Sequence, residues 1–339
     1  MIESANAELH LRALGGAAIA LAMAAALSGW LVRARLVVDR PNERSLHATP
    51  VPRTGGIAIL IAASATMAMG PLTALPGALW MAALALAVLS FADDLWNLPV
   101  VARFGAHLAA GAGAAWLLLP DAAPLALKLA AVLGVGWMIN LYNFMDGSDG
   151  LAGGMAVFGF GFLCVGAWMA GAADIGWACG VIAAAAAGFL VYNFNPARIF
   201  MGDVGSVPLG FLAACLGVAG AARGVWESWF PLLVFSPFIV DATVTLIRRV
   251  SRGARIWTAH REHYYQRLVM TGFGHRRTAL MAYALMAMQG LSGLLVMRHA
   301  PAFAWMLLSG WMVVYASAGL AIDRRWRSHL QTEGQRASA

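Results

Sequence analysis

The 339-residue chain is poor in charged residues and almost without lysine. Only 12% of its residues are charged, whereas a soluble domain averages about 25%. Hydrophobic residues make up 61% of the chain, and the mean hydropathy is +0.72. The net charge of +7 comes almost entirely from arginine, because Lys128 is the single lysine. This composition excludes an ordinary soluble domain and predicts a polytopic membrane protein.

Cysteine is also scarce, and its placement excludes two further classes of protein. Cys164, Cys179 and Cys215 lie within apolar runs, without paired spacing and without a nearby histidine. We therefore predict buried thiols rather than a disulfide framework or a zinc site. The sequence contains no low-complexity segment and no cleavable signal peptide, since the first apolar run is long enough to remain as a helix. It shows no fixed-period repeat of the kind found in inverted-repeat transporters.

Long apolar runs are abundant, and runs of about 20 residues predict membrane-spanning helices. The fold class we expect is all-α, with about eleven spans. Pro120 and Pro124 are the main evidence for a break between the fourth and fifth spans. The predicted spans are 13–32, 55–70, 77–92, 104–119, 124–141, 155–170, 175–192, 205–220, 228–247, 279–297 and 303–321.

Arginine is distributed unevenly and predicts the orientation of the chain. With eleven spans, the arginine-rich segments 33–54, 248–278 and the C-terminal tail all fall on one side, which the positive-inside rule makes cytoplasmic. The N-terminus then faces out and the C-terminus faces the cytoplasm. We expect one integral membrane domain, residues 1–325, and a short basic tail, 326–339. Its cytoplasmic loops are 33–54, 93–103, 142–154, 193–205 and 248–278. Most acidic residues lie on the same face, which indicates one composite site.

The most polar of these loops interrupts the apolar sequence between residues 139 and 155. It contains Asn140, Asn143, Asp146 and Asp149, with glycines between the aspartates. A charge at the bilayer centre costs about 2.5–3.5 kcal/mol on insertion scales, so such a cluster belongs at a membrane face or in a wet cavity. Oxygen-bearing side chains separated by glycine suit a hard cation and its phosphate ligand. A flexible turn would explain the glycines, but not two asparagines on one helix face.

Three other segments add acidic, basic or aromatic groups. Asp93 and Asp94 end the third span, and adjacent carboxylates raise each other's pKa unless a cation lies between them. They indicate a metal site, a base for an acidic substrate, or a solvated helix end. Arg103 begins the next span within reach of a phosphate. Asp203 precedes a predicted helix as an N-cap or a metal ligand, and Phe200 suits stacking on a nucleobase or anchoring at the membrane interface.

The first loop carries His47 beside five arginines and ends in the pair Gly55-Gly56. A helix N-terminus has unpaired N–H groups and favours anions, so this loop predicts either an anion site or an anchor for lipid headgroups.

The last loop reads His260-Arg-Glu-His263-Tyr-Tyr-Gln-Arg-Leu. Its histidine spacing is compatible with zinc, but no third ligand is evident. With Arg261 alongside, we favour diphosphate binding over a basic amphipathic segment on the membrane surface. Asp241, inside the ninth span, is either functional or paired with Arg248 or Arg249.

Taken in order, these motifs resemble the polyprenyl-phosphate N-acetylhexosamine-1-phosphate transferases, a family that includes phospho-MurNAc-pentapeptide translocase. The resemblance covers about residues 39–268. It implies transfer of a HexNAc-1-phosphate from a UDP-sugar to undecaprenyl phosphate with release of UMP, at the cytoplasmic face of a bacterial inner membrane. It also implies Mg²⁺, with Mn²⁺ as a second option, no nucleic-acid partner, and a homodimer as one form of assembly.

The resemblance also assigns roles to individual residues. Asp93 and Asp94 match the pair assigned to the lipid phosphate and its deprotonation. Asn143 and Asp203 match the Mg²⁺ positions, with Asp203 as a covalent nucleophile in a two-step alternative. The remaining matches are substrate contacts: Arg103 at the diphosphate, Asn140, Asp146 and Asp149 around metal and uridine, Phe200 on uracil, His260, Arg261 and His263 at the sugar diphosphate, and Gly55 and Gly56 at the start of the second span.

Two departures from the family pattern bear on the substrate. Asn97 stands where many members have a third aspartate. The last loop lacks the His-x-His-His pattern of GlcNAc-transferring relatives and is more similar to an O-antigen branch that starts on N-acetylfucosamine or N-acetylquinovosamine. GlcNAc-1-phosphate and phospho-MurNAc-pentapeptide transfer remain alternatives within the family. Outside it, the alternatives are a proton- or cation-coupled transporter that uses the aspartates as a relay, and a non-catalytic lipid flippase or scaffold.

Overall fold

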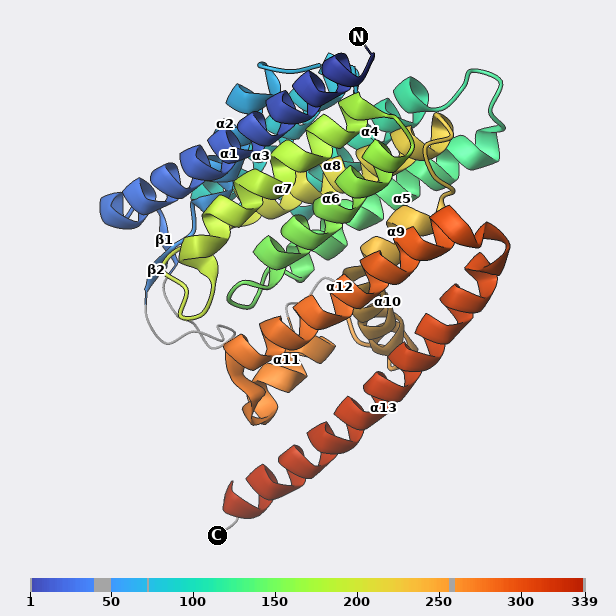
Figure 1. Ribbon diagram of the computed structural model, residues 1–339. Helices are drawn as coiled ribbons and strands as arrows, with labels where there is room; N and C mark the ends of the chain where they lie inside the picture. Colours follow the sequence, from blue (N-terminus) through green and yellow to red (C-terminus); the bar gives the residue numbers. More distant parts are fainter. Residues whose placement is uncertain (1, 40–49, 72, 256–259, 338–339) are drawn as a thin grey trace.

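The structure is a computed structural model, and it describes residues 2–39, 50–71, 73–255 and 260–337. The described chain is helical apart from two short strands, which confirms the all-α prediction (Figure 1). The strands β1 (Val38–Asp39) and β2 (Val51–Pro52) pair antiparallel. The helices are α1 (Ile2–Ala34), α2 (Gly55–Met67), α3 (Gly77–Trp96), α4 (Val100–Leu118), α5 (Leu125–Phe144), α6 (Leu151–Met169), α7 (Ala173–Asn193), α8 (Asp203–Ala222), α9 (Trp229–Val234), α10 (Ser236–Ser251), α11 (Tyr264–Leu268), α12 (Gly274–His299) and α13 (Ala304–Ala337), with short irregular helices η1 (Val269–Phe273) and η2 (Pro301–Phe303).

Nine helices within the described residues are long and apolar enough to cross a membrane. The predicted break between the fourth and fifth spans is confirmed, because α4 ends at Leu118 and α5 begins after Pro124. Two predicted spans differ from the structure. The second is the 13-residue helix α2, and the ninth, 228–247, is divided into α9 and α10. The division lies just before Pro237, which cannot donate the backbone hydrogen bond that would continue the first helix.

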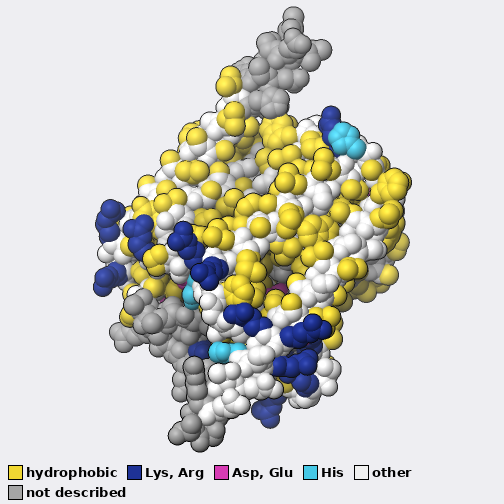
Figure 2. All heavy atoms as spheres, turned by 60° about the horizontal axis from the view of Figure 1, so that its bottom comes forward, with side chains coloured by type: hydrophobic (Ala, Val, Ile, Leu, Met, Phe, Trp, Pro, Cys, Tyr) yellow, Lys and Arg dark blue, Asp and Glu magenta, His cyan; other side chains and the backbone are white. Residues whose placement is uncertain are grey.

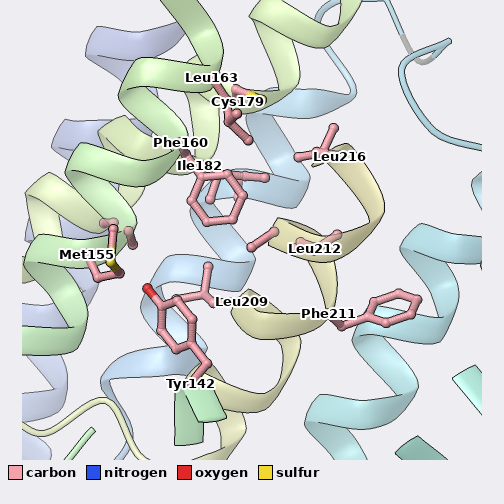
Figure 3. Close-up of a cluster of buried hydrophobic side chains, with 14 of the residues drawn as sticks. Tyr142, Met155, Phe160, Leu163, Cys179, Ile182, Leu209, Phe211, Leu212 and Leu216 are labelled. Carbon is pink, nitrogen blue, oxygen red and sulfur yellow. The ribbon is translucent and has the colours of Figure 1, made fainter. Parts of the chain in front are cut away.

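Helix α8 is the most enclosed of the nine, whereas α13 lies almost entirely outside the bundle. Figure 3 shows Leu209, Leu212 and Leu216 of α8 facing Phe160 of α6 and Ile182 of α7 in the apolar core. Cys179 and Cys215 are buried and Cys164 is half-buried, all as free thiols, as expected of residues in apolar runs. The tail predicted from residue 326 continues α13 as helix.

The start of α1 and the end of α13 lie at opposite ends of the molecule, and the short strands, the α5–α6 and α7–α8 connections and α11 lie toward the end where α13 finishes (Figure 1). Arginine side chains gather on that end (Figure 2). Which face is cytoplasmic stays a prediction from the arginine distribution.

A close backbone contact joins the start of α2 to the start of α8. A Cβ atom on Gly56 would lie 2.3 Å from the Cα of Gly205, so only glycine fits. The amides of Gly55 and Gly56 donate to the carbonyls of Phe200 and Met201, each at 2.9 Å. These two N–H groups are therefore occupied by the α7–α8 connection, and their role as substrate contacts stays a prediction.

Candidate active site

Four carboxylates meet two arginines at the end of the bundle where α3 finishes and α8 begins. Arg53, just after β2, donates a hydrogen bond to Asp94, and Arg103 donates to Asp93 Oδ2 at 2.6 Å. Asp146 and Asp203 both lie within the electrostatic range of Arg53. The structure thus brings together residues from five segments that are up to about 150 positions apart in sequence.

The turn between α3 and α4 determines how Asp93 is presented. Asn97 ends α3 in the left-handed conformation, with φ of 50°, and its N–H donates to the Asp93 carbonyl at 2.8 Å. Asparagine tolerates this conformation better than most residues. The chain then reverses, so that the Leu98 N–H donates to Asp93 Oδ1 at 2.7 Å. Position 97 therefore has a backbone role here, which accounts for an asparagine at that site without a third carboxylate.

Asn143 links the α5 terminus to the start of α8. Its amide group donates to Asp203 Oδ2 at 3.2 Å, and its Oδ1 accepts from the Ser206 hydroxyl at 2.9 Å. Asp146 lies beside this group. Burial raises the pKa of the Asp146 carboxyl well above its usual range, and the negative charge of Asp203 raises it further, against the lowering effects of a Gly202 backbone hydrogen bond and of Arg53. A cation placed between these two carboxyl groups would relieve their repulsion.

Such a donor set fits a small hard cation. All the side-chain atoms offered by Asn143, Asp146 and Asp203 as acceptors are oxygens, and Mg²⁺ is commonly held by one or two carboxylates together with substrate phosphates. Within the described part of the chain, no group of three or more His, Cys, Asp or Glu side chains forms a protein-only metal site.

Asp149 holds the neighbouring loops together. It is buried, and its Oδ2 accepts from Asn195 Nδ2 at 2.7 Å and from the Ala197 N–H at 3.1 Å. Its own N–H donates to His275 Nδ1 at 3.3 Å. Asn140 donates to the Gly136 carbonyl within α5 at 2.7 Å. The carboxylate of Asp149 thus connects the α5–α6 and α7–α8 connections, and its predicted place near uracil is not tested by these contacts.

Asp241 organises the last loop. Its Oδ1 accepts from the Tyr264 N–H at 2.9 Å and lies 3.2 Å from His263 Nδ1, and its Oδ2 accepts from the Tyr265 N–H at 3.0 Å. Because a carboxylate only accepts, His263 donates to it through Nδ1. Among the described contacts, the partners of Asp241 are this loop and Thr245 rather than the arginines considered from sequence.

The same loop lies against the acidic segment after α5. The Tyr265 hydroxyl donates to the Phe144 carbonyl at 3.1 Å, and a Cβ on Gly147 would lie 2.2 Å from that hydroxyl. The rings of His260 and His263 are 5.0 Å apart. Burial, followed by the neighbouring His263 and Arg249, lowers the pKa of His260 to about 4, so its ring is neutral at pH 7.

For three predicted site residues, the structure gives little beyond their burial or position. Phe200 is half-buried in the α7–α8 connection, and Arg261 is half-buried in the last loop. His47 lies outside the described residues.

Sequence reasoning did not select Arg53, Asn193 or His275. Arg53 supplies the cation beside Asp94, and Asn193 links the Gly150 N–H to the Ile199 carbonyl at 3.1 and 2.9 Å. Arg53 lies just before the glycine pair in the sequence, and that position indicates a charge at the start of a helix near the site. His275 pairs with a loop more than 120 positions away, and no local pattern indicates that pairing.

The fold and this site define a polytopic membrane protein with a carboxylate–arginine centre at one end of its helices. The sequence profile of glycosyl transferase family 4 matches residues 77–221. The chain is 32% identical over 268 residues to a probable undecaprenyl-phosphate N-acetylglucosaminyl 1-phosphate transferase of Bacillus subtilis (strain 168), covering 73% of this chain and 74% of that protein.

Two further relatives agree with this match. A decaprenyl-phosphate N-acetylglucosaminephosphotransferase of Mycolicibacterium smegmatis is 32% identical, covering 73% of this chain and 72% of its own. A phospho-N-acetylmuramoyl-pentapeptide-transferase of Staphylococcus saprophyticus is 31% identical over 47% of this chain and 50% of its own. The chain belongs to glycosyl transferase family 4, the family of polyprenyl-phosphate sugar-1-phosphate transferases.

Proposed function

We propose that this protein transfers a HexNAc-1-phosphate from a UDP-sugar to undecaprenyl phosphate at the cytoplasmic face of a bacterial inner membrane. A phosphate oxygen of the lipid attacks the phosphorus that carries the sugar. The bond from that phosphorus to the bridging oxygen breaks, and UMP leaves. The product is a lipid-diphosphate-linked sugar, which would initiate a cell-surface polysaccharide of the O-antigen type.

The observation that carries the proposal is the carboxylate–arginine centre itself. Phosphoryl transfer requires mainly positioning and charge neutralisation. Arg53 and Arg103 supply positive charge where a diphosphate and a lipid phosphate would meet. Asp93 and Asp94 are held by these arginines at the end of α3, where either could accept the proton of a lipid phosphate.

The nucleotide end is proposed to lie toward the other loops. The His263 ring, oriented by Asp241, would face the sugar diphosphate together with His260 and Arg261. Phe200, beside the start of α8, would stack on uracil near Asp149. The departure of the last loop from the His-x-His-His pattern favours N-acetylfucosamine or N-acetylquinovosamine as the sugar.

Asn143, Asp146 and Asp203 would hold Mg²⁺ or Mn²⁺, and a bound divalent ion would neutralise charge on the diphosphate. We favour a single displacement over a covalent intermediate on Asp203, because a carboxylate that binds a cation is a poor nucleophile. Appearance of a phospho-aspartate after addition of UDP-sugar alone would show that this preference is wrong.

The test is release of UMP by membranes supplied with undecaprenyl phosphate and a panel of UDP-HexNAc donors. We expect one donor to be preferred, and Asp203→Asn to lower its rate by at least about 100-fold, the scale of losing one preorganised electrostatic group. Asp174→Asn is the matched control. Asp174 pairs with Arg223 where α7 begins and α8 ends, at the other end of these helices from the carboxylate–arginine centre. Activity in Asp203→Asn equal to that of the control would contradict the assignment.

The transporter alternative receives less support. A coupled transporter is expected to place ionisable groups and its substrate site near the bilayer midplane. Here the four carboxylates of the centre lie at helix ends or in connections, at one end of the bundle. Uptake or efflux of a labelled ion by reconstituted protein, without any UMP release, is the result that would favour transport.

A further inference from the structure

A cationic cavity separate from the carboxylate–arginine centre lies behind the last loop, between α10, α11 and α13. It has a volume of about 280 Å³ and is lined by Arg248, Ser251, Arg252, Arg267, Asp323, Trp326 and Arg327. Four guanidinium groups therefore face one carboxylate. The volume lies just below the usual range of about 300–1,000 Å³ for small-ligand pockets, which suits a headgroup rather than a complete cofactor. None of these residues takes part in the centre described above.

The cavity is built around a buried ion pair rather than around mobile surface side chains. Arg267 is 8% exposed, and its Nη1 lies 2.7 Å from Asp323 Oδ1. Arg248 Nη1 lies 2.7 Å from Asp323 Oδ2. The Nε of Arg267 is buried with no hydrogen-bond partner. Because one carboxylate is shared by two arginines, positive charge remains for an anion.

Aromatic rings fix the positions of these arginines. The guanidinium carbons of Arg248 and Arg267 lie 5.4 and 5.5 Å from the ring centre of Tyr264, and Arg267 lies 5.9 Å from that of Trp326. Tyr264 is the first residue of α11 and directly follows His263. A ligand in the cavity would therefore contact Arg248 and Arg267, which pack on Tyr264, and through them the last loop.

The position of the cavity along α13 identifies the source of the anion. Residues 304–322 carry no charge, and residues such as Trp305 and Val313 are strongly exposed, as expected of a helix surface in contact with lipid tails. Asp323 and the cationic residues follow immediately. Trp326 is of the type enriched where a helix leaves the hydrocarbon layer. The cavity thus opens at the level of lipid phosphates, where basic pockets between membrane helices bind anionic headgroups.

We propose that this cavity binds the phosphodiester headgroup of an anionic phospholipid, and that the bound lipid orders α11. The phosphate would accept from Arg327 and from the buried Arg267 in charge-assisted hydrogen bonds, whereas Arg252 is already paired with Glu262. This lipid is distinct from the polyprenyl substrate, and its binding is measurable without any assay of transfer.

The test is binding of phosphatidylglycerol to the purified full-length protein in detergent, measured by native mass spectrometry. Arg327→Gln removes one exposed cation of the cavity. Arg324→Gln is the matched control, because Arg324 is exposed on the same helix, carries the same charge and does not line the cavity. We expect saturable binding that Arg327→Gln weakens about fivefold and Arg324→Gln leaves within twofold. Equal weakening in both variants, or binding that does not saturate, would overturn the proposal.

Two further measurements separate the sources of phosphate and test the buried pair. Inorganic phosphate at the same concentration, and zwitterionic phosphatidylcholine, are expected to leave hydrogen exchange in α11 unchanged, whereas phosphatidylglycerol slows it. Equal protection by inorganic phosphate would show that the lipid assignment is wrong. The double variant Arg267→Gln/Asp323→Asn keeps the net charge and removes the buried pair. It is expected to lose the specific binding, and unchanged affinity would contradict a site built on Arg267.

Discussion

Asp241 is expected to hold the last loop in its observed conformation, and Asp241→Asn tests this directly. The carboxylate accepts from two consecutive backbone amides, Tyr264 and Tyr265, at the start of α11. It also lies 3.2 Å from His263 Nδ1. The substitution preserves the shape of the side chain but removes its charge and converts one acceptor oxygen into a donor.

The size of the effect follows from these contacts. The amide oxygen of asparagine can replace Oδ1 as a neutral acceptor, at about half the strength of a charged one. The amide group at the other position would face the Tyr265 N–H, so that hydrogen bond is lost. Net hydrogen bonds to charged groups contribute about 1.5–3 kcal/mol each. We therefore expect the local opening of α11 to become easier by about 3 kcal/mol, which corresponds to roughly 100-fold faster exchange of the Tyr265 amide.

The assay is hydrogen exchange of the purified protein, followed by mass spectrometry of a peptide that covers residues 260–268. Exchange in α8 should stay unchanged, because the contacts of Asp241 are local. Asp174→Asn, at the opposite end of α7, provides an equal change of charge without touching the loop. A change in exchange of less than about threefold at Tyr265 would refute the reasoning. It would mean that packing of Tyr265 alone, and not the Asp241 cap, orders α11.

Three further predictions concern stability. The pKa of His260 is lowered from 6.5 to about 4, so the unfolded loop takes up a proton that the folded loop excludes. Stability should fall as pH drops from 6.5 towards 4, and His260→Asn should flatten this decline in a melting-temperature series; an unchanged pH profile would contradict the shift. Gly56→Ala should destabilise by about 1–3 kcal/mol through overpacking against Gly205, whereas Gly134→Ala, with nothing within 4 Å of the new Cβ, should leave the melting temperature equal or higher. Arg53→Gln should cost about 2 kcal/mol by leaving the buried carboxylate of Asp94 without its cation, with partial recovery in Arg53→Lys; equal melting temperatures in the two variants would show that the charge at position 53 does not matter.

Hydropathy by itself determined the helical class and most of the helix positions. Apolar runs of the length that crosses a bilayer have few other stable folds, because every backbone polar group must be satisfied within the segment. The prolines at 120 and 124 marked a real boundary for the same local reason. The division of the ninth predicted span was less visible, since Pro237 lies within an otherwise continuous apolar run.

The types of residue at the site were also evident from the sequence, because carboxylates and arginines are costly near lipid and gather where function requires them. Their partners were not. Asp94 pairs with Arg53, 41 positions earlier, and Asp241 pairs with His263, 22 positions later. Such pairings depend on which helix ends meet, and that depends on packing details such as the Gly56–Gly205 contact. Periodicity carries no information about contacts between distant segments, so only the tertiary structure decided which charge neutralises which.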